Sequence, residues 1–193
     1  MRISKATKKT MSIAMAMAVA VTSITAVPAN TASAKSKKVT ARAYFAGDTK
    51  AGNCTWIAGD GKTAKAVTKT VTLSKGKKTT VTLTIKNPGK SNGKKISKIK
   101  AATVFTVDLV NVLSSYKKVK CSNISVKADG KAVKVKKVFQ GSFEKNKADS
   151  KNNWRLSFYN QWGNQGDNSA KTNKAKSFAF KKNLTVTFTV VAK

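Results

Sequence analysis

Most of the chain beyond residue 40 alternates between apolar and polar positions, which is the period of a half-buried β-strand. The alternation is strictest over 184–190 and over 79–85, where Val81, Leu83 and Ile85 share one face and threonines occupy the other. A five-residue loop joins 79–85 to a similar segment at 67–73, so the two should form an antiparallel hairpin. We expect further strands at 40–46, 51–57, 154–159 and 177–180.

Two other stretches complete the predicted sheets. Residues 101–113 are apolar with little period, and their β-branched side chains favour a strand buried on both faces over a short helix. Asp108 lies inside this run, so it should either pair with a lysine or a backbone group, or contact a ligand or metal. Asp129-Gly130, the favoured sequence of a type I′ turn, separates 123–128 from 131–139 and predicts a hairpin. About eight or nine short strands bounded by turns indicate an all-β fold, a single antiparallel β-sandwich that is jelly-roll-like or Ig-like, over residues 40–193.

The first 34 residues have the pattern of a secretory signal peptide. Four basic residues precede an apolar stretch from Met11 to Val27, and Ala32-Ser33-Ala34 matches a cleavage site. The apolar stretch is too short and too mixed to span a membrane, and no second hydrophobic span follows. We therefore expect a secreted protein without a membrane span, retained on the cell wall if its ligand is there. Residues 35–39 should form a basic flexible tail ahead of the sandwich.

The charge of the chain is strongly positive. It contains 39 Lys and Arg against 7 Asp and Glu, a net charge of +32, or +28 once the signal peptide is removed. Only Arg2, Arg42 and Arg155 are arginines, so the charge is a coat of lysines. Lysine suits diffuse attraction, whereas arginine is the usual residue for reading phosphates and bases. The coat favours anionic surfaces such as teichoic-acid-like polymers, acidic glycans or extracellular DNA, and argues against specific nucleic-acid recognition.

The types of reactive residue limit the chemistry. The chain has no histidine, which excludes Ser-His-Asp and Cys-His catalysis, and its two cysteines cannot form a standard zinc site. In an exported protein Cys54 and Cys121 should form a disulfide, worth about 4 kcal/mol on a chain-entropy model, or else remain as two buried thiols. Few of the seven acids are placed to form the opposed pair of a glycosidase. We expect a non-enzymatic protein with no cofactor and no metal.

Residues 152–168 carry two of the three tryptophans and suggest a binding site. The segment begins as a strand in which Trp154, Leu156 and Phe158 should face the core, with Arg155, Ser157 and Tyr159 on the other face. It continues as a loop of amides and glycines that contains Trp162. On such a loop Trp162 is either a core residue or structural plug, or a platform for a polar ligand such as a sugar.

Several motifs resemble a known group of domains: Tyr44-Phe45-Ala46, Trp56, residues 105–109, residues 154–163 with Tyr159-Asn160-Gln161-Trp162-Gly163, and the terminal Thr-Val strand. Together they resemble β-sandwich accessory domains of secreted carbohydrate-active proteins from anaerobic Gram-positive bacteria, which are similar to carbohydrate-binding modules. The resemblance implies a sugar site of aromatics with amide neighbours, made here by Trp162, Tyr159, Asn160 and Gln161, with Trp56 and Arg155. The expected function is non-catalytic binding of carbohydrate or cell-envelope polysaccharide. The alternative is a polyanion-adhering surface protein that acts through its lysine coat.

Overall fold

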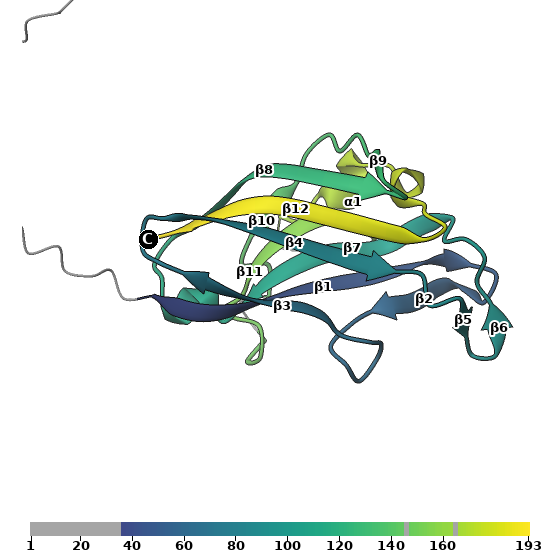
Figure 1. Cartoon of the computed structure of the whole chain (residues 1–193), viewed down its shortest axis with the longest axis horizontal. Helices are drawn as coiled ribbons and strands as arrows, with labels where there is room; N and C mark the ends of the chain where they lie inside the picture. The colour runs from purple at the N-terminus through teal and green to yellow at the C-terminus, as the bar shows by residue number, and fades with distance from the viewer. Residues whose placement is uncertain (1–35, 145–146, 164–165) are drawn as a thin grey trace, which may run out of the picture. The chain divides into compact units, whose positions relative to one another are not determined.

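The computed structural model describes residues 36–144, 147–163 and 166–193 (Figure 1). The predicted signal peptide, residues 1–34, lies outside these ranges. Within them the strands form two main antiparallel sheets and one small hairpin, which confirms the predicted all-β sandwich. No helix in the described ranges is long and apolar enough to cross a membrane.

One sheet has six strands, in the order β10-β11-β7-β1-β2, with β3 also paired to β1. The first half of β1 pairs with β3 and its second half with β2, while β7 lies along its other side. The strands of this sheet are β1 (Lys37–Thr49), β2 (Gly52–Ala58), β3 (Val67–Leu73), β7 (Ala101–Val110), β10 (Phe139–Gly141) and β11 (Trp154–Asn160).

The other main sheet has four strands, in the order β4-β12-β8-β9, with β12 central (Figure 1). Its strands are β4 (Lys78–Lys86), β8 (Val119–Ala128), β9 (Lys131–Ala132) and β12 (Asn183–Ala192). The remaining elements are short: the hairpin of β5 (Lys90–Ser91) and β6 (Lys94–Lys95), η1 (Val112–Ser114), α1 (Ser169–Thr172) and η2 (Ala175–Phe178).

The core lies between the two main sheets and is rich in phenylalanine. Phe105 of β7 stacks on Phe158 of β11, with 4.4 Å between ring centroids, and meets Phe178 edge-on at 5.4 Å. Phe45 of β1 packs against both Phe105 and Phe180. All five rings are buried, and burial of each contributes roughly 1.5–3 kcal/mol. Because β7 is central and packed on both sides, its outward residues are buried as well, which confirms the strand predicted at 101–113 as far as residue 110.

Two predictions about elements were wrong. The flexible tail does not extend to residue 39, because Lys37–Val39 pair with β3 and Val39 is buried. The strand predicted at 177–180 is largely the 3₁₀ helix η2, with a single bridge between Ile99 and Phe180.

The hairpin predicted around Asp129-Gly130 is correct only near its turn. Asp129 and Gly130 both have positive φ, 50° and 83°, as a type I′ turn requires. Pairing with β8 ends at Val133, whose N–H bonds to the carbonyl of Val126. Further along, the side-chain amide of Asn173 accepts from the N–H of Lys136 and donates to the carbonyl of Lys137. The chain then crosses to the six-stranded sheet as β10.

Candidate functional site

A pocket of about 340 Å³ lies on the outward side of the six-stranded sheet. Alternation along the strands aims one set of side chains away from the core, and described residues of the loops before and after β11 supply the rest of the wall. The aromatic pocket, as we call it, has four aromatic residues in its lining. Its lining consists of Tyr44, Trp56, Val104, Thr106, Phe143, Glu144, Lys147, Ser150, Arg155, Asn160, Trp162 and Asp167.

The floor of the pocket is set by strand register. Tyr44 of β1 lies opposite Thr106 of β7, which in turn lies opposite Ser157 of β11. On β1 the small residues Ala41 and Ala43 fill the inward positions, so the larger Tyr44 must point outward. The floor is therefore a rigid sheet surface, a kind of support that holds side chains more precisely than loops do.

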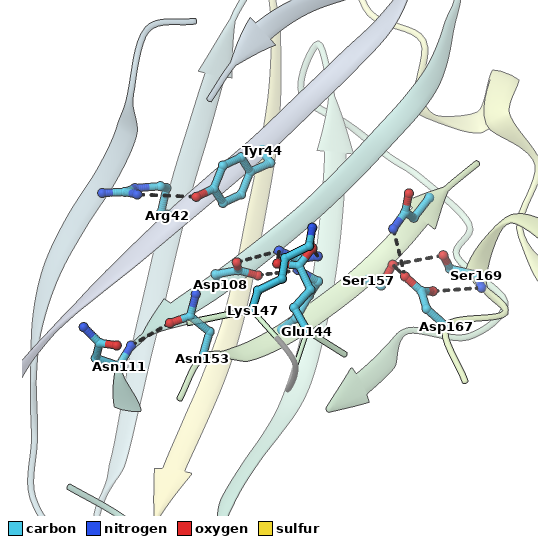
Figure 2. Close-up of polar contacts among 12 residues, drawn as sticks. Arg42, Tyr44, Asp108, Asn111, Glu144, Lys147, Asn153, Ser157, Asp167 and Ser169 are labelled. Atoms are coloured by element: carbon cyan, nitrogen blue, oxygen red, sulfur yellow. Dashed lines mark hydrogen bonds and ion pairs between the residues drawn. The ribbon is translucent and has the colours of Figure 1, made fainter. Parts of the chain in front are cut away.

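Arg155 binds two carboxylates, those of Asp108 and Glu144, and both acids are labelled in Figure 2. Its Nε and Nη2 donate to the two oxygens of Asp108 at 2.6 and 2.8 Å, and Nη1 donates to Glu144 at 3.0 Å. Lys147 also lies 3.4 Å from Glu144. Desolvation alone would lower the pKa of Arg155, but its hydrogen bonds and charge interaction with Asp108 outweigh it and raise the pKa. Desolvation likewise opposes the charged form of Glu144, yet the guanidinium of Arg155 keeps its pKa below the ordinary value.

These bonds define what Arg155 can do. A guanidinium has five N–H groups, and the bonds to Asp108 and Glu144 occupy four of them, since Nη2 also reaches Glu144 at 3.4 Å. Asp108 is 1% exposed, so its bonds to Arg155 offset the cost of burying a polar group. Asp108 is therefore paired, which is one of the two roles expected of it, although its partner is an arginine rather than a lysine. Arg155 mainly positions the pocket wall and has one N–H left for a ligand.

Asp167 holds the loop that carries Trp162, and Figure 2 shows its contacts with Ser157 and Ser169. Ser157 of β11 donates its hydroxyl to Asp167 at 2.7 Å, the Asn160 side chain donates at 3.2 Å, and the backbone N–H of Ser169 donates at 3.1 Å. Asn160 also accepts a bond from the backbone N–H of Trp162 at 3.2 Å. A buried carboxylate therefore links the end of β11 to both ends of the loop.

Gly163 allows this loop to close tightly. A Cβ at this position would lie 2.6 Å from the backbone oxygen of Asp167, which is closer than real Cβ contacts come. A larger residue would push the two ends of the loop apart and displace Trp162.

Trp162 is exposed rather than buried. Its side chain is 55% exposed, and among the residues that the structure describes it is the only large hydrophobic one that is. Of the two expected roles, structural plug and platform, the plug is therefore wrong. The ring lies at the pocket, where Trp56 of β2 and Tyr44 of β1 contribute to the same lining.

The structure brings four of the six predicted site residues together: Trp162, Asn160, Arg155 and Trp56 line the aromatic pocket. Tyr159 does not, because a bulge in β11 shifts the register between Ser157 and Tyr159. Tyr159 consequently packs against the core, and Asn160 takes the outward position that simple alternation assigned to Tyr159. Gln161 is exposed beside the pocket and is not part of its lining; its backbone N–H bonds to Thr103.

Several lining residues were missed from the sequence. Tyr44 could have been found, because the alternation of Ala41, Ala43 and Phe45 places it on the opposite face. Glu144 and Asp167 lie in polar loops without a local motif, and only the fold brings them to β11. Phe143, Lys147 and Ser150 belong to the same class.

The predicted disulfide is not formed. Cys54 and Cys121 are both free thiols, and they lie on different sheets, Cys54 exposed on β2 and Cys121 buried on β8. Burial raises the pKa of Cys121 to about 12, so it is a neutral core residue. In the described residues no group of three or more Cys, Asp or Glu side chains is placed to hold a metal ion.

No protein-family model, no curated protein and no solved structure matches this chain.

Proposed function

We propose that this protein is a secreted, non-catalytic binder of carbohydrate or cell-envelope polysaccharide, with the aromatic pocket as its site. The observation that carries the proposal is the 55% exposure of Trp162 at a pocket whose wall also contains Trp56 and Tyr44. Leaving a large aromatic in water forgoes the free energy of its burial. A ligand with apolar faces and polar edges, as a sugar ring has, would cover the indole and recover that free energy.

The polar residues of the pocket support the same ligand class. The side chains of Asn160 and Ser150 border it, together with the remaining N–H of Arg155. Such groups bond directionally to hydroxyls. Trp162 and Trp56 would supply stacking, and Asn160 would help to fix the orientation of the sugar.

The local charge favours a neutral ligand over an anionic one. Arg155 and Lys147 are offset by Asp108 and Glu144, and Asp167 adds a further negative charge nearby. The pocket is therefore not part of the positive coat, although the chain as a whole is strongly basic. A neutral polysaccharide meets no uncompensated charge there.

The carboxylates support a binding role rather than a catalytic one. Both oxygens of Asp167 accept bonds from within the protein, and Glu144 accepts from Arg155 and Lys147. A general acid needs a raised pKa, whereas the pKa of Glu144 is lowered. Both acids would hold the pocket wall in place.

The alternative function, adhesion to polyanions through the lysine coat, is favoured by the large number of exposed lysines on the strands and turns. The two functions predict different salt dependence. Adhesion by charge should collapse as salt approaches about 0.2 M, whereas stacking should persist.

A pull-down separates them. The protein would be incubated with insoluble cellulose, xylan, chitin and purified cell wall at low and high salt. Retention on one polysaccharide at high salt supports the pocket function. Binding to every anionic surface that disappears with salt would refute it and leave the lysine coat as the functional feature.

A further inference from the structure

The outward face of the four-stranded sheet is a regular array of hydroxyl groups. Strands β4, β12 and β8 lie side by side with β12 in the middle (Figure 1). Their register aligns Thr82 with Thr187 and Ser125 in one row, and Thr84 with Thr185 in the next. We call this surface the hydroxyl face. It is the far side of the sandwich from the aromatic pocket, because the inward sides of both sheets form the core.

The hydroxyls of the array are ordered and partly free. Thr82 and Thr187 are 3.0 Å apart at their Oγ1 atoms, and Thr84 and Thr185 are 3.1 Å apart. In each pair one hydroxyl donates to the other, which keeps its own O–H for an outside acceptor. The alternate positions of a strand are about 7 Å apart and neighbouring strands about 4.8 Å apart, so the array offers donors at regular intervals.

Lysines frame this array at both ends. Lys78 and Lys86 occupy the first and last positions of β4, and Lys120 and Lys127 occupy the second position and the last but one of β8. All four are exposed, and register places Lys120 and Lys78 on either side of Val191, and Lys127 beside Thr185.

The chain's acids are segregated away from this face. None of the seven lies in β4, β8 or β12, and three lie in or beside the aromatic pocket: Asp108, Glu144 and Asp167. The carboxylate of Asp129, at the turn after β8, accepts hydrogen bonds from the backbone N–H groups of residues 181–183 at 2.7–3.0 Å. The positive charge of the hydroxyl face is therefore uncompensated by any acid on it.

We propose that the hydroxyl face is a second binding surface, which takes a linear phosphodiester polymer of the poly(glycerol phosphate) kind. Lysines supply the point charges that phosphates need, and the threonine and serine hydroxyls donate to phosphate oxygens between them. A flexible single chain fits a face about three strands wide. No arginine lies in the three strands to read bases, which disfavours sequence-specific nucleic acid.

The test is a pair of charge-matched variants. K78Q/K86Q/K120Q/K127Q removes the frame, and K62Q/K98Q/K151Q/K174Q removes four exposed lysines from loops outside this sheet. Affinity for poly(glycerol phosphate) would be measured across a salt series for the wild-type protein and both variants. The frame variant should lose about tenfold or more in affinity, and its log–log salt slope should fall by about 3 if the four lysines each neutralise one phosphate. The loop variant should change little. Equal losses in both variants would overturn the proposal in favour of a diffuse coat.

Two further arms complete the test. Thr82→Val with Thr187→Val keeps the β-branched shape but removes two hydroxyls, and should weaken binding several-fold at unchanged stability. Duplex DNA with the same number of phosphates should bind more weakly than poly(glycerol phosphate). Tighter binding of the duplex, or no effect of the valine variant, would overturn the proposed ligand. Trp162→Ala should leave this binding unchanged, which separates it from the aromatic pocket.

Discussion

Arg155 and Asp108 lie directly opposite each other on β11 and β7, and the guanidinium binds both oxygens of the carboxylate, at 2.6 and 2.8 Å. A bidentate pair of this kind fixes orientation as well as distance. The pair holds β11 against the central strand β7. It lies two residues before Ser157, where the bulge that turns Asn160 outward begins. The same guanidinium reaches Glu144, so the pair also anchors the loop that forms the other wall of the pocket.

Removal of the Asp108 charge should destabilise the protein strongly. Asp108→Asn leaves the largely buried Arg155 with one carboxylate partner, and breaking a buried pair costs about 3–5 kcal/mol when the remaining charge has none. Because Glu144 stays, we expect a loss of about 2–3 kcal/mol in urea unfolding. Asp149→Asn, an exposed acid in the loop before β11, is the matched control and should change the free energy of unfolding by less than about 0.5 kcal/mol. Equal effects would contradict the structural role of the pair.

Stability should fall in acid partly through Glu144. Its folded-state pKa lies below the ordinary 4.5, so its contribution is fully present above pH 4.5 and is lost as pH falls through the folded pKa. Glu144→Gln should cost on the order of 1 kcal/mol at pH 7. The difference between wild type and Glu144→Gln should shrink as pH is lowered below 4.5, measured by urea unfolding at fixed ionic strength. A difference that stays constant or grows in acid would be inconsistent with this pairing.

The two thiols should differ in reactivity. Cys54 is exposed and should react with a thiol reagent in the native protein, whereas Cys121 should react only after unfolding, because it is buried and its pKa is about 12. Native protein should therefore titrate one thiol and unfolded protein two, without reductant. Cys54→Ser should remove the native signal. Unfolded protein with no free thiol before reduction would mean that a disulfide forms after all.

Gly163→Ala should impair binding without touching the ligand. The added methyl would lie 2.6 Å from the backbone oxygen of Asp167, so the loop must shift and carry Trp162 with it. We expect a several-fold loss of polysaccharide affinity and a stability loss of about 1–3 kcal/mol. Gly166→Ala, in the same loop with open space around it but a φ of +91°, is the control for backbone strain. Similar affinity losses in both variants would indicate strain rather than displacement of the indole.

Local pattern was enough to predict the sandwich, because burial and alternation are read residue by residue. The buried strand over 101–110 and the turn at Asp129-Gly130 followed from such patterns. Such patterns could not predict the bulge in β11. One extra residue reverses the face of every residue after it in the strand, so Tyr159 faces the core. Backbone contacts made by distant side chains, such as those of Asn173 with Lys136 and Lys137, leave no local pattern either.

The site was predicted only in its aromatic part. Trp162 and Trp56 are conspicuous because tryptophan is rare in the chain, whereas Glu144 and Asp167 are ordinary loop acids that gain their role through contact with β11. Arg155, a predicted ligand contact, is largely occupied by the carboxylates of Asp108 and Glu144, which only the tertiary fold brings to it.

The central claim, that the aromatic pocket binds carbohydrate through Trp162, is tested most directly by the affinity of Trp162→Ala for the polysaccharide retained at high salt. Gln161→Ala is the matched control, because it is the adjacent exposed residue and does not line the pocket. Trp162→Ala should lose about tenfold or more in affinity, as truncation of an aromatic hot spot does, with unchanged thermal stability. Gln161→Ala should bind like the wild type. Wild-type affinity of Trp162→Ala at high salt would contradict the claim.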